Sequence, residues 1–245
     1  MQIGLLYAIT GVSVMRIWLS FFIIVFVAAT LVPHARTQDV PLPLMRPPAQ
    51  AMQLQRAQTA WESGVGLLEV KARVDLVLRA RQDDVQALIL RAKVALAMDD
   101  AKAAFSDAAH AVRFDSTAGE AHLLMAESAL VLGESQQAER ALRQASEYSI
   151  EDAIYHVRLS AIAMRLEQLE RAESYARVAL NLHPDEPAAY YQLARVFMEK
   201  GYKDAAVLTL KQGFDRGVLD SANVQDDPSL SVLASDVTLT PWMQR

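Results

Sequence analysis

The sequence predicts an all-α protein in which antiparallel helix pairs stack one upon another as an α-solenoid. Three series of small residues recur at a spacing of 34 and keep the same register: Ala104, Ala138, Ala172 and Ala206; Ala111, Ala145, Ala179 and Gly213; and Ala92, Ala126, Ser160 and Ala194. A small side chain that recurs in helical context marks a close crossing of two helices, and this period is typical of helix–turn–helix arrays. Each repeat of such an array packs mainly on its neighbours, so the pattern favours a binding surface over a catalytic site.

Composition narrows the possible functions. The chain has 245 residues, a net charge of −5 and no cysteine. The acidic balance argues against nucleic acid as a partner, because nucleic-acid binding usually needs a basic face. The lack of cysteine excludes disulfides, thiolate catalysis, cysteine-based zinc or iron–sulfur sites, and a bacterial lipid anchor.

Residues 1–36 predict an export signal or a membrane anchor. The apolar segment 17–32 follows Arg16 and contains no charged residue. It is shorter than the roughly 20 apolar residues of a comfortable span, and slightly long for the apolar core of a cleavable signal. A cleaved signal, a retained anchor and a buried helix therefore stay open, as does a start at Met15 in place of Met1. A signal or an anchor would carry the repeats out of the cytoplasm, to the periplasm or the cell envelope.

The segment 37–50 predicts an extended linker. It contains four prolines, which disfavour helix and favour extended backbone: Pro41, Pro43, Pro47 and Pro48.

Residues 85–220 divide into four repeats of two amphipathic helices each: 85–118, 119–152, 153–186 and 187–220. In the last repeat Pro187 stands at an expected first helical position, where its missing N–H costs nothing. One slot falls in the turn between the two helices of every repeat and holds Asp99, Gly133, Glu167 and Gly201.

With its small-residue series, Tyr190 early in a first helix and Phe197 seven residues later, the segment 85–217 resembles the tetratricopeptide repeat family. The resemblance implies a right-handed solenoid whose first helices line a concave, partner-binding face. The earlier repeats depart from the family's aromatic positions: Leu88, His122 and His156 stand at the slot of Tyr190, and Ala95, Ala129 and Ala163 at that of Phe197.

At both ends of the array we expect atypical segments that cap the core. Residues 51–84 fit a degenerate fifth repeat, in which Val70 and Val77 replace the alanines and Trp61 covers the core. The tail 221–245 predicts a cap over the last helix pair, formed by Leu230, Val232 and Leu233.

The histidines, the acidic residues and the common catalytic motifs indicate neither an enzyme nor a metal or cofactor site. His122 and His156 share one repeat slot, and neighbouring repeats would hold them roughly 10 Å apart, too far to share a metal. His110 is expected on a solvent-facing surface. The sequence has no phosphate-binding glycine loop and no Gly-x-Ser-x-Gly elbow. Its acidic pairs lie between helices, where they suit helix caps.

The candidate binding residues lie in three rows on the first helices. Two rows are mostly apolar, seven residues or two helical turns apart, with a mixed row between them. The rows are Ile89, Leu123, Val157 and Tyr191; Lys93, Glu127, Ala161 and Arg195; and Leu96, Leu130, Met164 and Met198. The slots that clamp a carboxylate in some family members hold Ile, Leu, Val and Tyr here, so that activity is not expected.

The sequence therefore predicts an exported, non-enzymatic adaptor that binds a protein or peptide partner in an apolar groove. Three alternatives stay open. The rows could belong to the core. The groove could be filled by the protein itself, through its tail or a second copy. In the second case the protein would be a self-associating scaffold at the membrane. An enzyme with an unrecognised site is the third.

Overall fold

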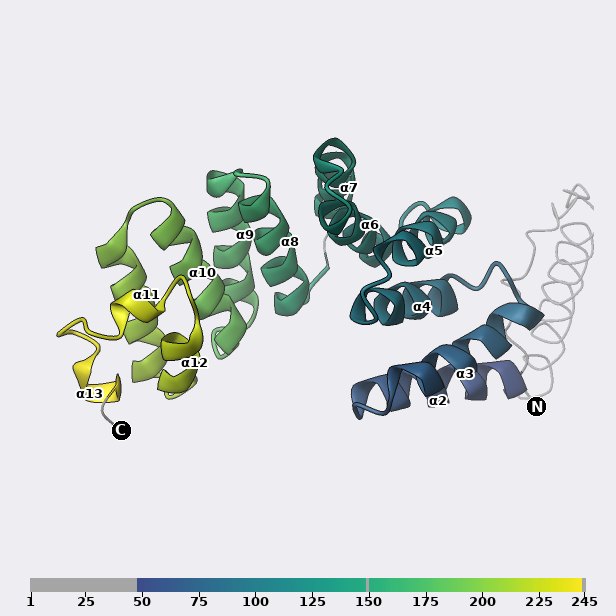
Figure 1. The fold of residues 1–245 in the computed structure, drawn as a ribbon, viewed down its shortest axis with the longest axis horizontal. Helices are drawn as coiled ribbons and strands as arrows, with labels where there is room; N and C mark the ends of the chain where they lie inside the picture. Colours follow the sequence, from purple (N-terminus) through teal and green to yellow (C-terminus); the bar gives the residue numbers. More distant parts are fainter. Residues whose placement is uncertain (1–47, 149, 244–245) are drawn as a thin grey trace, which may run out of the picture. The chain divides into compact units, whose positions relative to one another are not determined.

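The computed structural model describes residues 48–148 and 150–243, and every regular element in these ranges is helical (Figure 1). The predicted signal or anchor in residues 1–36 lies outside the described residues, as does most of the predicted linker. Pro48–Arg245 form one compact unit. None of the helices described in it has the length and apolarity needed to cross a membrane.

Ten helices form five pairs, and the two members of each pair pack on each other. The pairs are α2 (Pro48–Glu62) with α3 (Leu67–Ala80), α4 (Val85–Ala97) with α5 (Ala101–Phe114), α6 (Gly119–Val131) with α7 (Ser135–Glu147), α8 (Ala153–Arg165) with α9 (Leu169–Leu182), and α10 (Pro187–Glu199) with α11 (Lys203–Asp215).

The linker prediction was wrong at its C-terminal end, because α2 already begins at Pro48. A proline is tolerated in the first turn of a helix, where its missing N–H would have no intrahelical partner. Residues 48–50 therefore belong to the first helix pair.

The small-residue series mark helix crossings, as predicted. The ten alanines and Ser160 are 0% exposed, and Gly213 is buried. A Cβ atom on Gly213 would lie 2.6 Å from the side chain of Leu219, which follows α11, and 3.1 Å from Tyr190 of α10, so an alanine here would require Leu219 to shift. The small-residue series thus determine how closely the two helices of each pair approach.

The turns inside the repeats share one backbone geometry. Asp99, Gly133, Glu167 and Gly201 all have positive φ, at 60°, 77°, 59° and 76°. The next residue in each turn donates its N–H to a carbonyl five residues earlier, for example Glu134 to Ala129 at 2.8 Å. This is the left-handed C-terminal cap that glycine favours, and here two acidic residues adopt it at a conformational cost.

The shared slot of His122, His156 and Tyr190 fastens the loops between repeats. His122 Nε2 lies 3.0 Å from the Ser116 carbonyl, His156 Nε2 lies 3.0 Å from the Ile150 carbonyl, and the Tyr190 hydroxyl donates to Pro184 at 2.8 Å. Each partner is six residues upstream. The two histidines therefore have the structural role that their common slot indicated.

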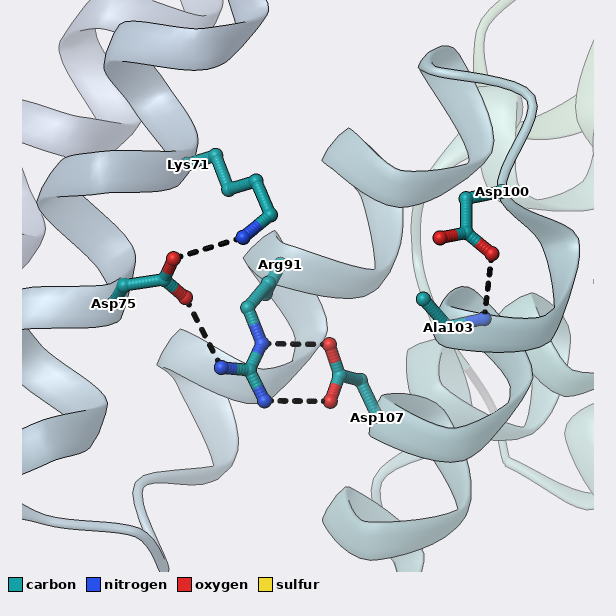
Figure 2. A network of polar contacts seen from close by, with 6 residues as sticks. All are labelled: Lys71, Asp75, Arg91, Asp100, Ala103 and Asp107. Atoms are coloured by element: carbon teal, nitrogen blue, oxygen red, sulfur yellow. Dashed lines mark hydrogen bonds and ion pairs between the residues drawn. The ribbon is translucent and has the colours of Figure 1, made fainter.

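A charged network joins the first pair to the second. Arg91 of α4 donates two hydrogen bonds of 2.7 Å to Asp107 of α5 and one of 3.0 Å to Asp75 of α3, which also accepts from Lys71 (Figure 2). The hydrogen bonds that Arg91 donates to the Asp107 carboxylate raise the pKa of Arg91. For Asp75, burial acts to raise the pKa, but Lys71 and Arg91 outweigh it and lower the pKa.

The tail covers the last pair, though not with all of the predicted residues. It contains α12 (Ser221–Asp226), a 3-10 turn (Ser231–Leu233) and α13 (Thr240–Met243). Leu230, Leu233 and also Leu239 are completely buried, whereas Val232 is 57% exposed. The prediction for Val232 was wrong because the 3-10 turn points its side chain away from the helices that Leu233 covers.

Candidate functional site

The predicted binding residues lie on α4, α6, α8 and α10, and each of these helices contacts the next along the unit. Acidic caps fix where three of the helices begin: Asp84, Asp152 and Glu186 accept backbone N–H groups of the first turn. Residues 34 apart therefore occupy matching positions on adjacent helices. We call this surface the first-helix face.

All but one of the twelve residues in the three predicted rows are half-buried, which is compatible with a surface that a partner could cover. The exception is Leu123, which is 0% exposed and packs in the core beside Leu159. Its assignment to the binding surface was wrong.

An ion-pair network lies on the same helix as Leu123 and joins α6 to α8. Glu120 and Glu127 of α6 lie two turns apart on one side of the helix, and Arg158 of α8 reaches both. Arg158 donates 2.7 Å and 2.6 Å hydrogen bonds to the two oxygens of Glu127 and a 2.7 Å bond to Glu120. Leu123 lies between the two glutamates in sequence and packs in the apolar core that α6 shares with α8.

Lys93 of α4 extends the network with a 3.0 Å ion pair to Glu120. Burial acts to lower the pKa of Arg158, but its hydrogen bonds and charge interactions with Glu127 and Glu120 prevail and raise that pKa. Two cations thus face two carboxylates across α4, α6 and α8. The charges that the sequence placed between the apolar rows are neutralised inside the protein.

At α10 the tail engages the same face. The Tyr191 hydroxyl contacts the backbone of Asp220 at 3.0 Å, both to its carbonyl and to its N–H. Arg195 Nε donates to the Asp227 carboxylate at 2.6 Å, and this carboxylate is almost entirely buried. Two of the predicted site residues therefore hold the cap in place.

The third row is partly exposed along its whole length. We call Leu96, Leu130, Met164 and Met198 the C-terminal row, because each lies near the C-terminal end of its first helix. All four are half-buried. Val131 and Met98, next to this row, are 57% and 38% exposed. Sequence reasoning missed both residues, although each lies within two positions of a row member.

Other features of the described surface do not compete with this row. Three hollows are lined by other residues: one between α2 and α3, one among α3, α4 and α5, and one among α9, α10 and α11. Within the described ranges, no group of three or more histidine, aspartate or glutamate side chains is arranged to hold a metal ion.

A family model described as tetratricopeptide repeat matches residues 187–216. The structure of PilW, described as a widely conserved type IV pilus biogenesis factor, is similar with a TM-score of 0.66 and 16% identity, over 80% of this chain and 91% of PilW. For pilF of Pseudomonas aeruginosa the TM-score is 0.62 and the identity 15%, over 79% of this chain and 88% of that one. No curated protein sequence matches this chain.

A thermophilic TPR protein of Thermus thermophilus, TTC0263, has a TM-score of 0.60 and 18% identity, over 75% of this chain and 95% of that one. The array is a tetratricopeptide-repeat solenoid. At these identities the likeness establishes the fold alone. The tetratricopeptide-repeat helices account for the period of 34, and the face on which the site residues lie is that of their first helices.

Proposed function

We propose that this protein is an exported, non-enzymatic adaptor that holds a protein partner along the C-terminal row. One observation carries the proposal: four flexible or branched apolar side chains recur at the same slot of four adjacent helices and stay partly exposed. Methionine adapts its shape to irregular partners, so Met164 and Met198 suit such a surface.

The charges on this face favour a partner that binds through apolar contacts. Lys93 and Arg158 are paired with Glu120 and Glu127, and Arg195 is paired with Asp227. A charged partner would have to break these pairs, whereas an amphipathic helix or extended segment could cover the row and leave them intact.

The similar structures support a binding role in the cell envelope. PilW is described as a pilus biogenesis factor. YrrB, which has a TM-score of 0.52 and 17% identity, is described as a TPR protein with an unusual peptide-binding site. The apolar segment 17–32 would supply the export signal or the anchor.

Paired substitutions test this proposal. Leu130→Asp with Met164→Asp places two carboxylates in the row, and we expect roughly 100-fold weaker capture of partners from a membrane-containing lysate, from about 1.5 kcal/mol lost at each site. The matched control is Leu208→Asp with Val232→Asp, at two exposed apolar residues on other surfaces. Circular dichroism checks that both proteins keep their helices. Equal capture by wild type and the row variant would contradict the proposal.

A further inference from the structure

The outer face of α3 carries an apolar stripe that the repeat architecture does not require. Leu68 and Leu76 are 72% and 54% exposed, and Ala72 between them is exposed as well. These residues are four apart, so they form one ridge along the helix. The buried side of the same helix is formed by other residues, among them Val70, Val74 and Val77.

Comparison with the following repeats shows that this stripe is unusual. The slots of Leu68, Ala72 and Leu76 hold Lys102, Ser106 and His110 in α5 and Gln136, Arg140 and Gln144 in α7. At the last of these slots His110 and Gln144 are exposed, like Leu76. The position of Leu76 thus faces solvent in α3, α5 and α7, and apolar residues occupy all three slots in α3, whereas α9 and α11 hold one each, Val178 and Leu208.

We infer that this stripe is the contact surface for a second copy of the same chain, whose α3 crosses it in antiparallel direction about a two-fold axis at Ala72. A ridge of residues four apart can pack into the same ridge of another helix. Leu68 of one copy then lies against Leu76 of the other, and the small Ala72 occupies the point of closest approach. A two-fold contact needs such a self-complementary patch.

The charges beside the stripe fit this arrangement. Glu69 and Arg73 lie on one flank, and Lys71 and Asp75 lie on the other; each pair is bridged within α3, at 2.6 Å and 2.9 Å, and Asp75 also accepts a hydrogen bond from Arg91 of α4. A two-fold axis brings like flanks together in antiparallel order. Glu69 therefore approaches Arg73 of the second copy, and Lys71 approaches its Asp75, so each flank is complementary to itself.

The size of the stripe sets the strength of the contact. Two crossing helices bury less than the roughly 1,200 Å² of a small stable interface. Dimers of the free protein should therefore form only at high concentration. Confinement of both copies to one membrane or one assembly would raise their effective concentration and favour the contact.

Cysteine cross-linking in the full chain tests the inference, since the chain has no cysteine of its own. Helix axes about 8–10 Å apart and a Cα radius of about 2.3 Å leave the two Ala72 Cα atoms about 3.4–5.4 Å apart, and the upper part of this range allows a disulfide. Ala72→Cys should give a disulfide-linked dimer on mild oxidation. Ser106→Cys, in the same slot of α5, is the matched control and should give several-fold less.

A second variant separates a specific contact from collision. Leu76→Glu in the Ala72→Cys chain should reduce the dimer to the level of the Ser106→Cys control, with an unchanged melting temperature because Leu76 is exposed. Leu68→Glu serves the same purpose if Leu76→Glu fails to fold. The inference is overturned if Ala72→Cys gives no more dimer than the control, if it cross-links only to other proteins, or if the glutamates leave the dimer intact.

Discussion

The first-helix faces of α8 and α10 carry matching residues in different surroundings. On α8, Val157, Ala161 and Met164 stay partly exposed. On α10, the residues in the first two of these slots, Tyr191 and Arg195, bind the tail through Asp220 and Asp227. The same repeat position thus serves the protein's own cap at the end of the array and is open to a partner in the middle. This difference confines the proposed binding surface to α4, α6 and α8 and the outer edge of α10.

The largest expected effect distinguishes the open face of α8 from its buried side. Ala163 is 0% exposed and Ala161 is half-buried, two residues apart on one helix. Ala163→Leu should overpack the core and lower the free energy of unfolding by about 3 kcal/mol. Ala161→Leu should leave it nearly unchanged. Urea unfolding of the two variants measures the contrast, and equal losses would show that the face of α8 is not open.

Arg195 of α10 should stabilise the cap that the tail forms over the last helix pair. Arg195→Ala leaves the buried Asp227 carboxylate without its cation, and we expect a loss of about 2 kcal/mol. Hydrogen exchange should rise in residues 219–239 before it rises elsewhere. The comparison on α8 is Arg158→Ala. The two glutamates that lose this arginine are partly exposed, and Glu120 keeps its ion pair with Lys93. Exchange that stays slow throughout the tail would argue against this role of Arg195.

Smaller changes in stability are expected at the turns that precede α9 and α11. Glu167, after α8, has a φ of 59°, and Gly201 occupies the same slot after α10. Glu167→Gly should stabilise the protein by about 1 kcal/mol, because glycine adopts this backbone without strain. Gly201→Ala should destabilise it by a similar amount. Thermal melts measure both changes in stability. A lower melting temperature for Glu167→Gly, or a higher one for Gly201→Ala, would contradict the account.

Acid should weaken the contact between α9 and α10. The hydrogen bond from Lys200 lowers the pKa of Glu173 below its usual 4.5. Because the folded pKa is depressed, this stabilisation is complete above the unfolded pKa and is lost as the pH falls through the folded value. The melting temperature should therefore drop from about pH 5 to pH 3 by less in Glu173→Gln than in wild type. Parallel curves would contradict this contribution.

Much of the fold was predictable because it depends on local spacing. The small-residue series, the turn slot and the acidic caps each use residues within one repeat, and the structure confirms them. The histidines were interpreted correctly for the same reason, since His122 and His156 occupy the slot of Tyr190.

The binding surface was less predictable because it depends on contacts between repeats. Leu123 has the same period as Ile89, yet it packs in the core beside Leu159 of the next repeat. No local pattern indicates such a pairing. At Tyr191 and Arg195 the sequence left open whether a partner or the tail lies on the face, because the tail that contacts them has no counterpart in the repeats.

Site-specific cross-linking to a partner tests the central claim most directly. A photoreactive maleimide attached to Ala161→Cys would sit on the first-helix face of α8, and one attached to Ser174→Cys would sit on the exposed side of α9. The chain contains no other cysteine. The account predicts covalent adducts with a captured partner from position 161 and few from position 174. Adducts from position 174 alone would place the partner on the second helices and contradict it.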